Sequence, residues 1–314
     1  MQSSRDLGGR IRHNPKTLML IIYNPTAGRR RVRHLWSVLD VLVAHGVRLE
    51  VVETRHAGHA RSLAQEAACG GMRLVVAAGG DGTIAEVADG LAGSDSRLGI
   101  IPLGTANVLA HELHLPSAAG DVAAILVSGK VVSLWPGIAC NASGSRLFVQ
   151  MLGIGFDAHV VHHISRPVKR LIGRGAYVVQ TLRELSRYTF ETIQVAVDGV
   201  MHEAGSVIVC KGGLYGGPYM LAPEASCASP GFSVVLFKHA GIGAALLAGA
   251  AMPLNMMARL PGVIRLRAND VAFIEGHALP AQSDGDPAGC TPLHVTDAIS
   301  PIEVLVGKNW ANSP

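Results

Sequence analysis

Short apolar runs alternate with segments of helical spacing over the first third of the chain. Continuous or alternating apolar runs predict strands at 18–23, 48–54, 74–78 and 98–103. Apolar residues at helical spacing predict helices between them, at 32–44, 58–68 and 84–91. Strands that alternate with helices are typical of a parallel sheet, and such sheets bind ligands at the carboxyl ends of their strands. The pattern therefore predicts an α/β domain over residues 17–134.

The pattern changes after Trp135. Short β-type runs, separated by glycine, predict strands at 148–152, 193–197, 207–210, 233–237, 263–268 and 292–306. Helical spacing is confined to 160–188 and 240–258. We therefore predict a strand-rich, antiparallel second domain over residues 135–309. The first sixteen residues are rich in basic and polar side chains and are expected to form a flexible tail.

The composition indicates that most of the chain is globular and that its cysteines are reduced. Hydrophobic residues make up 49% and charged residues 16% of the 314 positions, which excludes disorder for most of the chain. The five cysteines contain no CxxC pair and are expected to be buried, reduced thiols. The apolar run at 18–23 is too short for a secretory signal, so a cytoplasmic location is expected.

One apolar segment has to be considered as a candidate for a membrane-spanning helix. Residues 239–258 contain no Asp, Glu, Lys or Arg. Pro253, Asn255 and three glycines interrupt this run, whereas a spanning helix needs about 20 mostly apolar residues. The sequence therefore favours a buried or interfacial helix here.

Positive charge gathers at two places. Residues 1–33 carry eight basic side chains and one acidic one, and residues 166–187 form a second basic stretch. Such clusters attract phosphates of nucleotides, nucleic acids or anionic lipids. Nucleic acid is not expected as a partner, because only 14 of the 314 residues are Phe, Tyr or Trp, too few to interleave regularly with the basic residues.

Three glycine-containing turns follow the predicted strands, at 24–28, 79–83 and 104–107. Glycine lets backbone N–H groups converge on an anion, so three such turns at one sheet edge predict a phosphate cradle. The chain lacks both the GxxxxGK[ST] loop and the kinase glycine loop with its HRD and DFG companions. Asp81, set among glycines, is suited to a metal-bound phosphate; the alternative is an N-cap of the following helix.

Two other groups of side chains are candidates for chemistry. Asp284-Gly285-Asp286 can be a hairpin tip or a pair of working carboxylates, and the spacing leaves both open. A zinc site is not expected. The pair His111 and His114 lacks the HExxH spacing, and the histidines at 159, 162 and 163 have no cysteine or carboxylate at ligand spacing.

Together these motifs resemble the diacylglycerol-kinase catalytic domain, a family that includes soluble bacterial lipid kinases, sphingosine kinases and ceramide kinases. The resemblance rests on GGDGT at 79–83, with Asn24-Pro25 before it and PLGTAN at 102–107 after it. It continues through GIGFDA at 153–158 and APEA at 222–225 to DGD at 284–286, in the family's order.

The resemblance implies a first domain similar to the nucleotide-binding halves of NAD kinases and phosphofructokinases, and a β-sandwich-like second domain. ATP, with Mg²⁺, and a lipid hydroxyl would meet between them. The implied ATP site comprises Asn24, Thr54, Gly79, Gly80, Asp81, Gly82, Thr83, Gly104, Thr105 and Asn107. Asp286 would be the general base, with Asp81 and Asp284 as further catalytic candidates, and arginines of 29–33 would help to hold the triphosphate.

Three departures from the family pattern stand out. Asp286 replaces the usual Glu and is one methylene shorter. Ser229-Pro230-Gly231 replaces an Asp-containing turn that the family associates with a structural magnesium ion, which puts that ion in doubt here. Val108 follows Asn107 where Asp or an aromatic residue is frequent.

The sequence thus predicts an ATP-dependent lipid kinase that acts on a diacylglycerol-like or sphingoid hydroxyl. It would associate peripherally with the inner face of the membrane through residues 239–258 and the basic clusters, and it could form a homo-oligomer. The alternatives are a kinase for a soluble acceptor such as NAD, and a catalytically inactive lipid-binding homologue.

Overall fold

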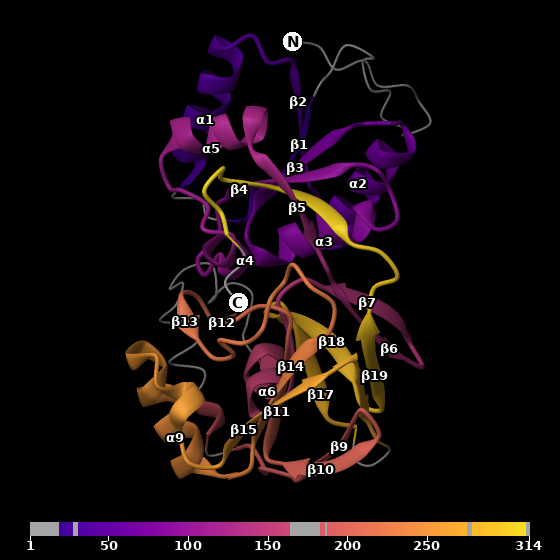
Figure 1. Cartoon of the computed structure of the whole chain (residues 1–314), viewed down its shortest axis with the longest axis vertical. Coiled ribbons are helices and arrows are strands. Elements are labelled where there is room, and N and C mark those ends of the chain that lie inside the picture. The colour runs from indigo at the N-terminus through magenta and orange to yellow at the C-terminus, as the bar shows by residue number, and fades with distance from the viewer. Residues whose placement is uncertain (1–18, 28–30, 164–182, 186, 275–277, 312–314) are drawn as a thin grey trace.

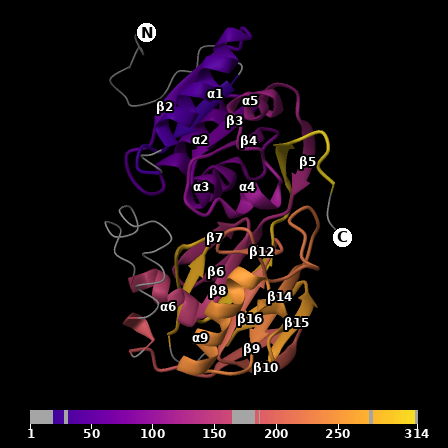
Figure 2. The same ribbon diagram turned by 90° about the vertical axis from the view of Figure 1, so that its left-hand side faces the viewer.

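The chain folds into two lobes stacked along its long axis (Figure 1), and a quarter turn of the view keeps them distinct (Figure 2). The computed structural model describes residues 19–27, 31–163, 183–185, 187–274 and 278–311. The expected tail, Arg29 and Arg30, and most of the second basic stretch lie outside these residues.

The first lobe is built on one six-stranded sheet. Its order is β2 (Leu49–Glu53), β1 (Met19–Tyr23), β3 (Leu74–Gly79), β4 (Arg97–Pro102), β20 (Ile302–Val306) and β5 (Lys130–Leu134). The first five strands run parallel, and β5 pairs antiparallel with β20. The carboxyl ends of the parallel strands therefore share one edge, which is where ligands bind in this class of sheet.

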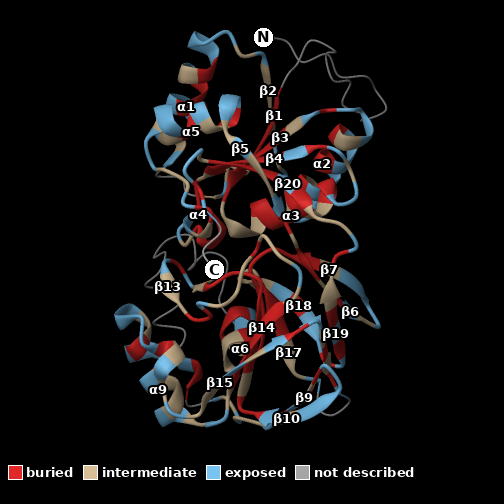
Figure 3. Ribbon diagram, viewed as in Figure 1, coloured by how far each residue is buried: buried red, intermediate tan, exposed pale blue. Residues whose placement is uncertain are grey.

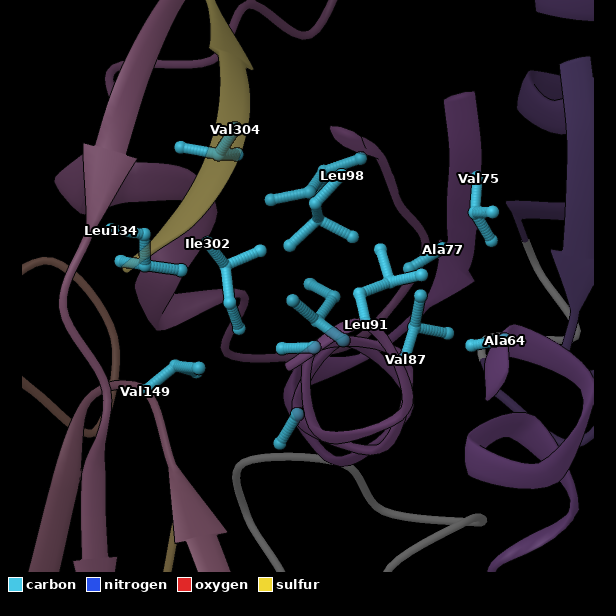
Figure 4. Packing of buried hydrophobic residues seen from close by; sticks show 14 of the residues in the cluster. Ala64, Val75, Ala77, Val87, Leu91, Leu98, Leu134, Val149, Ile302 and Val304 are labelled. Atoms are coloured by element: carbon cyan, nitrogen blue, oxygen red, sulfur yellow. The ribbon is translucent and has the colours of Figure 1, made fainter. Parts of the chain in front are cut away.

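Helices cover both faces of this sheet. On one face α1 (Val32–Ala44) and α5 (Ala119–Ser128) lie against each other, and α1 buries Leu35, Val38, Leu39 and Leu42 along a single helical stripe. On the other face lie α2 (His59–Cys69) and α3 (Asp81–Leu91). Figure 4 shows Val87 and Leu91 of α3 packed against side chains of β3, β4 and β20, with Val149 of the second lobe at the rim of this core.

The second lobe is a sandwich of two antiparallel six-stranded sheets. One sheet has the order β10 (Val200–Ala204), β9 (Ile193–Val197), β16 (Asp270–Phe273), β19 (Leu293–Asp297), β6 (Gly137–Asn141) and β7 (Gly144–Phe148). The other has the order β15 (Val263–Ala268), β14 (Phe232–Phe237), β11 (Ser206–Cys210), β8 (Met151–Gly155), β17 (Pro280–Ser283) and β18 (Asp286–Cys290). Their facing side chains form one apolar core.

Several short elements of the described residues lie outside the sandwich. They are α4 (Val108–Glu112), between the lobes, α6 (Phe156–His163), the hairpin of β12 (Leu214–Tyr215) and β13 (Tyr219–Met220), and α9 (Ile242–Ala251). The turns η2 (Met252–Leu254) and η3 (Met257–Arg259) continue α9. Only Ala251 of α9 is buried, and Figure 3 shows the helix mostly exposed or intermediate at one edge of the molecule. Among the described residues, no helix has the length and apolar character needed to cross a bilayer.

The predicted fold class is confirmed, and the predicted elements of the first lobe agree with the structure to within a few residues. In the second lobe, β6, β10, β16, β17 and β18 were not predicted, and most of the predicted helical segment at 160–188 lies outside the described residues. Three further details differ. The run 292–306 forms two strands in different sheets, so β20 completes the first sheet although it lies in the segment 135–309. The run 148–152 joins the end of β7 to the start of β8. Cys69, Cys140 and Cys290 are exposed rather than buried, since they occupy element ends and an outer sheet face.

Candidate active site

Two glycine turns at the carboxyl edge of the first sheet touch through their backbones. The N–H of Leu103 donates to the carbonyl of Gly79 at 2.8 Å, which aligns the ends of β4 and β3. A Cβ on Gly104 would lie 2.5 Å from the Cα of Gly80. Only glycine fits this contact, so the turns at 79–83 and 104–107 form one continuous floor.

Asn24 and Thr54 lie at the same edge. The side-chain amide of Asn24 donates to the hydroxyl of Thr83 at 2.9 Å. The N–H of Thr54 donates to the carbonyl of Tyr23 at 2.8 Å, which places Thr54 at the end of β2 beside Asn24. Thr105 is exposed on the neighbouring turn. The structure thus brings the proposed nucleotide residues to one sheet edge.

The acidic turn from the second lobe lies against this floor. Asp286 begins β18, and its Oδ2 occupies the space that a Cβ on Gly82 would take. Gly82 belongs to the first turn of α3, whose positive end favours nearby negative charge. The turns near 24, 80 and 105 therefore meet the acidic pair near 285, as is required if Asp286 is to act on a group held by these turns.

Asp284 holds this turn in place. Its carboxylate accepts hydrogen bonds from the backbone N–H groups of Val149 at 2.8 Å, Gln150 at 2.9 Å and Met151 at 3.0 Å. Burial raises the pKa of Asp284 to about 6, against the effect of these donors and with a further contribution from the charge of Asp81. Because its oxygens are committed to the backbone, Asp284 positions the turn rather than acting on a substrate proton.

Asp81 lies between two helix N-termini. It is the first residue of α3, and its Oδ1 accepts a hydrogen bond from the N–H of Leu109 in α4 at 3.4 Å. Burial raises the pKa of Asp81, although the backbone N–H groups of residues 107–109 oppose this. Asn107 is buried in a left-handed conformation with φ of 50°, and its Oδ1 has no hydrogen-bond partner among the described residues. Carboxylate and amide oxygens are ligands that suit a phosphate-bound Mg²⁺, so these residues fit such an ion.

A hydrogen-bond chain that the sequence did not reveal supports the acidic turn from behind. The N–H of Gly285 donates to Gln282 at 2.9 Å, and the amide of Gln282 donates to Asp157 at 2.8 Å. The hydroxyl of Tyr215 donates to the other oxygen of Asp157 at 2.5 Å. Burial raises the pKa of Asp157, against the effect of both donors. Asp157 belongs to the GIGFDA motif, so this motif supports the acidic turn.

Glu86 has a comparable role in the first lobe. Its two carboxylate oxygens accept hydrogen bonds from the N–H of Gly58 at 2.8 Å and of Ala60 at 3.1 Å. These are the free donors at the start of α2, so Glu86 caps that helix from α3. The cap fixes the loop that follows Thr54 at the edge of the site.

The ammonium group of Lys211 binds to the turn at Ser229–Gly231. Lys211 is fully buried, and its Nζ donates to the carbonyls of Ser229 at 3.2 Å and Gly231 at 2.9 Å and to Asp297 Oδ1 at 2.6 Å. Burial lowers the pKa of Lys211, whereas Asp297 opposes this. These oxygens are already committed to a positive charge. The residues at this turn therefore do not fit the structural magnesium ion that the resemblance implies.

The contact of Gly82 with Asp286 gives a direct test of the site. Gly82→Ala is expected to lower kcat at least about tenfold, because the new methyl group would displace the Asp286 carboxylate from its position. Gly120→Ala is the matched control, since Gly120 is also the second residue of its helix and has open space around it. Steady-state kinetics of both variants would decide; equal activity would mean that the position of Asp286 is not critical.

Comparisons with known proteins agree with this geometry. The model of the diacylglycerol kinase catalytic domain matches residues 18–135, and the model of the YegS C-terminal NAD kinase beta sandwich-like domain matches residues 150–306. A diacylglycerol kinase of Bacillus subtilis (strain 168) is 28% identical over 296 residues, covering 93% of this chain and 97% of that protein. A Pseudomonas putida protein named "Probable lipid kinase YegS-like" is 32% identical over 213 residues, covering 66% and 69% of the two chains.

Solved structures share the fold. Two from Bacillus anthracis str. Sterne superpose with TM-scores of 0.77 and 0.70 at 21% and 19% identity, and the second is described as a diacylglycerol kinase. Each covers 95% of this chain, and the match spans 98% and 100% of the two structures. The converging turns, the sandwich and these matches lead to one conclusion: the chain belongs to the diacylglycerol kinase and YegS-like family of lipid kinases.

Proposed function

We propose that the protein transfers the γ-phosphoryl group of ATP to the hydroxyl of a diacylglycerol-like lipid. The observation that carries this proposal is the contact between Asp286 and Gly82, which joins a carboxylate of the second lobe to the glycine floor of the first. A phosphoryl group held on that floor would lie beside a carboxylate that can receive the proton of an acceptor hydroxyl.

The floor binds the triphosphate. Backbone N–H groups of the 79–83 and 104–107 turns, together with the N-terminus of α3, favour phosphate oxygens at this edge. Asp81 and Asn107 would hold the Mg²⁺ that accompanies the nucleotide, and this ion supplies neutralisation of phosphate charge. Asn24 and Thr54 contact the nucleotide at the neighbouring strand ends.

Asp286 accepts the proton from the lipid hydroxyl. In a loose phosphoryl-transfer transition state the hydroxyl proton leaves late, so orientation of the carboxylate matters more than its basicity. Asp284 and Gln282 set that orientation by fixing the backbone on either side of Gly285. The shorter side chain of Asp286 is offset by the absence of a side chain on Gly82, which lets the carboxylate approach the floor.

A substrate panel tests this function. Purified protein with Mg²⁺ and ATP is offered diacylglycerol, sphingosine or NAD in parallel, and phosphorylated product is measured directly. Diacylglycerol is expected to give the highest kcat/KM. Phosphorylation of NAD alone would support the soluble-acceptor alternative, and no product from any acceptor, with lipid binding retained, would support an inactive homologue.

The lipid substrate lies in a membrane, and α9 is the surface that we propose for docking on it. Its exposed side chains are apolar, namely Ile242, Leu246 and Leu247, with Leu254 and Met256 in the segment that follows. The exposed basic residues Lys238 and Arg259 flank this patch. An exposed apolar helix flanked by positive charge is typical of peripheral binding to an anionic bilayer, here at the cytoplasmic face.

Flotation with vesicles tests this surface. Leu247→Glu is expected to weaken binding to phosphatidylglycerol–phosphatidylcholine vesicles at least about tenfold, since a buried leucine contributes about 1.5–3 kcal/mol. Val43→Glu is the control, because Val43 is 60% exposed on α1 and Leu247 is 52% exposed on α9. Equal loss in both variants, or binding that ignores salt and anionic lipid, would contradict docking through α9.

A further inference from the structure

A group of metal-ligating side chains lies on α6, away from the proposed nucleotide floor. His159 and His163 are four residues apart on this helix, and Glu184 approaches them from a later part of the chain. One ligand atom from each residue lies within 4.8 Å of the other two. Sequence spacing could not show this group, because 21 positions separate the carboxylate from the nearer histidine and only the fold brings them together.

The ring of His163 is oriented as a metal ligand. Its Nδ1 lies 2.9 Å from the carbonyl oxygen of His159. A carbonyl can only accept, so in the neutral ring Nδ1 carries the proton and Nε2 carries a lone pair. Histidines that bind metals usually donate their other ring N–H to a carbonyl or carboxylate in this way. The ring of His159 stacks beside it, with centroids 4.1 Å apart.

Glu184 supplies a buried carboxylate. Its side chain is 2% exposed, and its Oε2 lies 2.9 Å from Nε2 of His159. Burial would raise the pKa of Glu184, but the hydrogen bond from His159 and the charges of His163, His159 and Arg187 outweigh it, so the net pKa is lowered. Arg187 Nη1 lies 3.6 Å from the other oxygen, Oε1. The oxygen that faces the histidines is therefore negatively charged at neutral pH.

We propose that His159, His163 and Glu184 bind Zn²⁺. Zinc bonds to imidazole nitrogen and carboxylate oxygen are about 2.0–2.2 Å long, so tetrahedral ligands lie roughly 3.3 Å apart. The three atoms reach that spacing through side-chain movements of about an ångström. His163 is exposed, so a fourth position faces solvent, and the ring of Tyr188 packs beside that of His159 with centroids 4.9 Å apart.

Zinc at this site would fasten α6 to the residues around Glu184. The same helix supports the acidic turn, because His162 Nε2 lies 2.9 Å from the carbonyl of Ala281 and Asp157 accepts from Gln282. A metal that binds the folded chain and not the unfolded chain also raises thermal stability. Binding of Zn²⁺ would therefore also stabilise β17, the strand that precedes the acidic turn.

Isothermal titration of the EDTA-treated and desalted full-length protein with ZnCl₂ tests the proposal. One saturable site is expected, together with a rise in melting temperature. His163→Ala should weaken Zn²⁺ binding at least about tenfold while leaving the His159–Glu184 hydrogen bond in place. Cobalt(II) gives a second readout, since a tetrahedral site is expected to produce strong visible absorption in the parent protein and not in this variant.

His45→Ala is the matched control. His45 is an exposed helix-end histidine whose Nδ1 lies 2.7 Å from the carbonyl of Val41, the same local arrangement as in His163. This variant should keep full affinity. The proposal is overturned if the parent shows no saturable binding, if His163→Ala retains the parent affinity, or if His45→Ala loses as much. If Glu184→Gln folds and binds Zn²⁺ as the parent does, the carboxylate has no part in the site.

Discussion

Asp286→Asn is expected to lower kcat by about 10²–10⁴-fold, the usual contribution of a positioned proton acceptor. The amide keeps the shape of the side chain beside Gly82 but cannot accept the proton of the lipid hydroxyl. Circular dichroism and the melting temperature should match those of the parent, because the turn is anchored by Asp284 and Gln282. Steady-state kinetics with diacylglycerol and ATP measure the effect.

Two related variants test the roles of the Asp286 and Asp81 carboxylates. Asp286→Glu restores the residue usual in the family and should keep kcat within about tenfold of the parent, since the carboxylate remains. Asp81→Asn should also abolish turnover, by weakening the hold on the nucleotide. If Asp286→Asn kept the parental rate, the proton acceptor would have to be Asp81, because the oxygens of Asp284 are held by three backbone N–H groups.

Lys211→Met is expected to destabilise the protein by about 3–5 kcal/mol, the usual cost of removing one partner from a buried ion pair. The variant would leave Asp297 and the carbonyls of Ser229 and Gly231 without their ammonium donor. The ammonium group also lies 4.8 Å from the centre of the Phe232 ring, a favourable cation–π contact that methionine would lose. Chemical denaturation measures the change.

Lys238→Met is the control for this prediction. Lys238 also donates to a backbone carbonyl, that of Glu203 at 2.6 Å, but it is exposed, so its loss should cost less than about 1 kcal/mol. In the background of Asp297→Asn, the further cost of Lys211→Met should shrink, because no ionised carboxylate is then left without the ammonium group. Full additivity of the two substitutions would argue against the pairing. If Lys211→Met were as stable as the parent protein, the contacts of the Lys211 ammonium group would not stabilise the fold.

Most of the nucleotide floor could be predicted from sequence because its chemistry is local. Glycines that follow apolar runs mark the carboxyl ends of strands, and the 79–83 and 104–107 turns meet because β3 and β4 are neighbours. Only the resemblance to a known family indicated that Asp286 belongs to the same site as these turns. Neither periodicity nor spacing could have made that link, since about 200 residues separate the two parts of the site.

The parts that sequence did not predict depend on contacts between distant segments. The sequence does not distinguish Lys211 from the other lysines, and only the fold shows that its ammonium group binds the turn at Ser229–Gly231 and Asp297. The polar strands β17 and β18 have no apolar alternation and form because β8 pairs with β17. Asp284 belongs to the same motif as Asp286 and precedes it by two residues, yet its three backbone contacts separate its role from that of Asp286.

The placement of β20 has a consequence for how the protein is made. This strand fills the gap between β4 and β5 in the first sheet, yet in the sequence it follows all the strands of the sandwich. The first lobe therefore stays incomplete until translation has passed through the entire sandwich. Stopping synthesis before residue 302 would leave the edges of β4 and β5 that face β20 unpaired, with an exposed apolar gap between them.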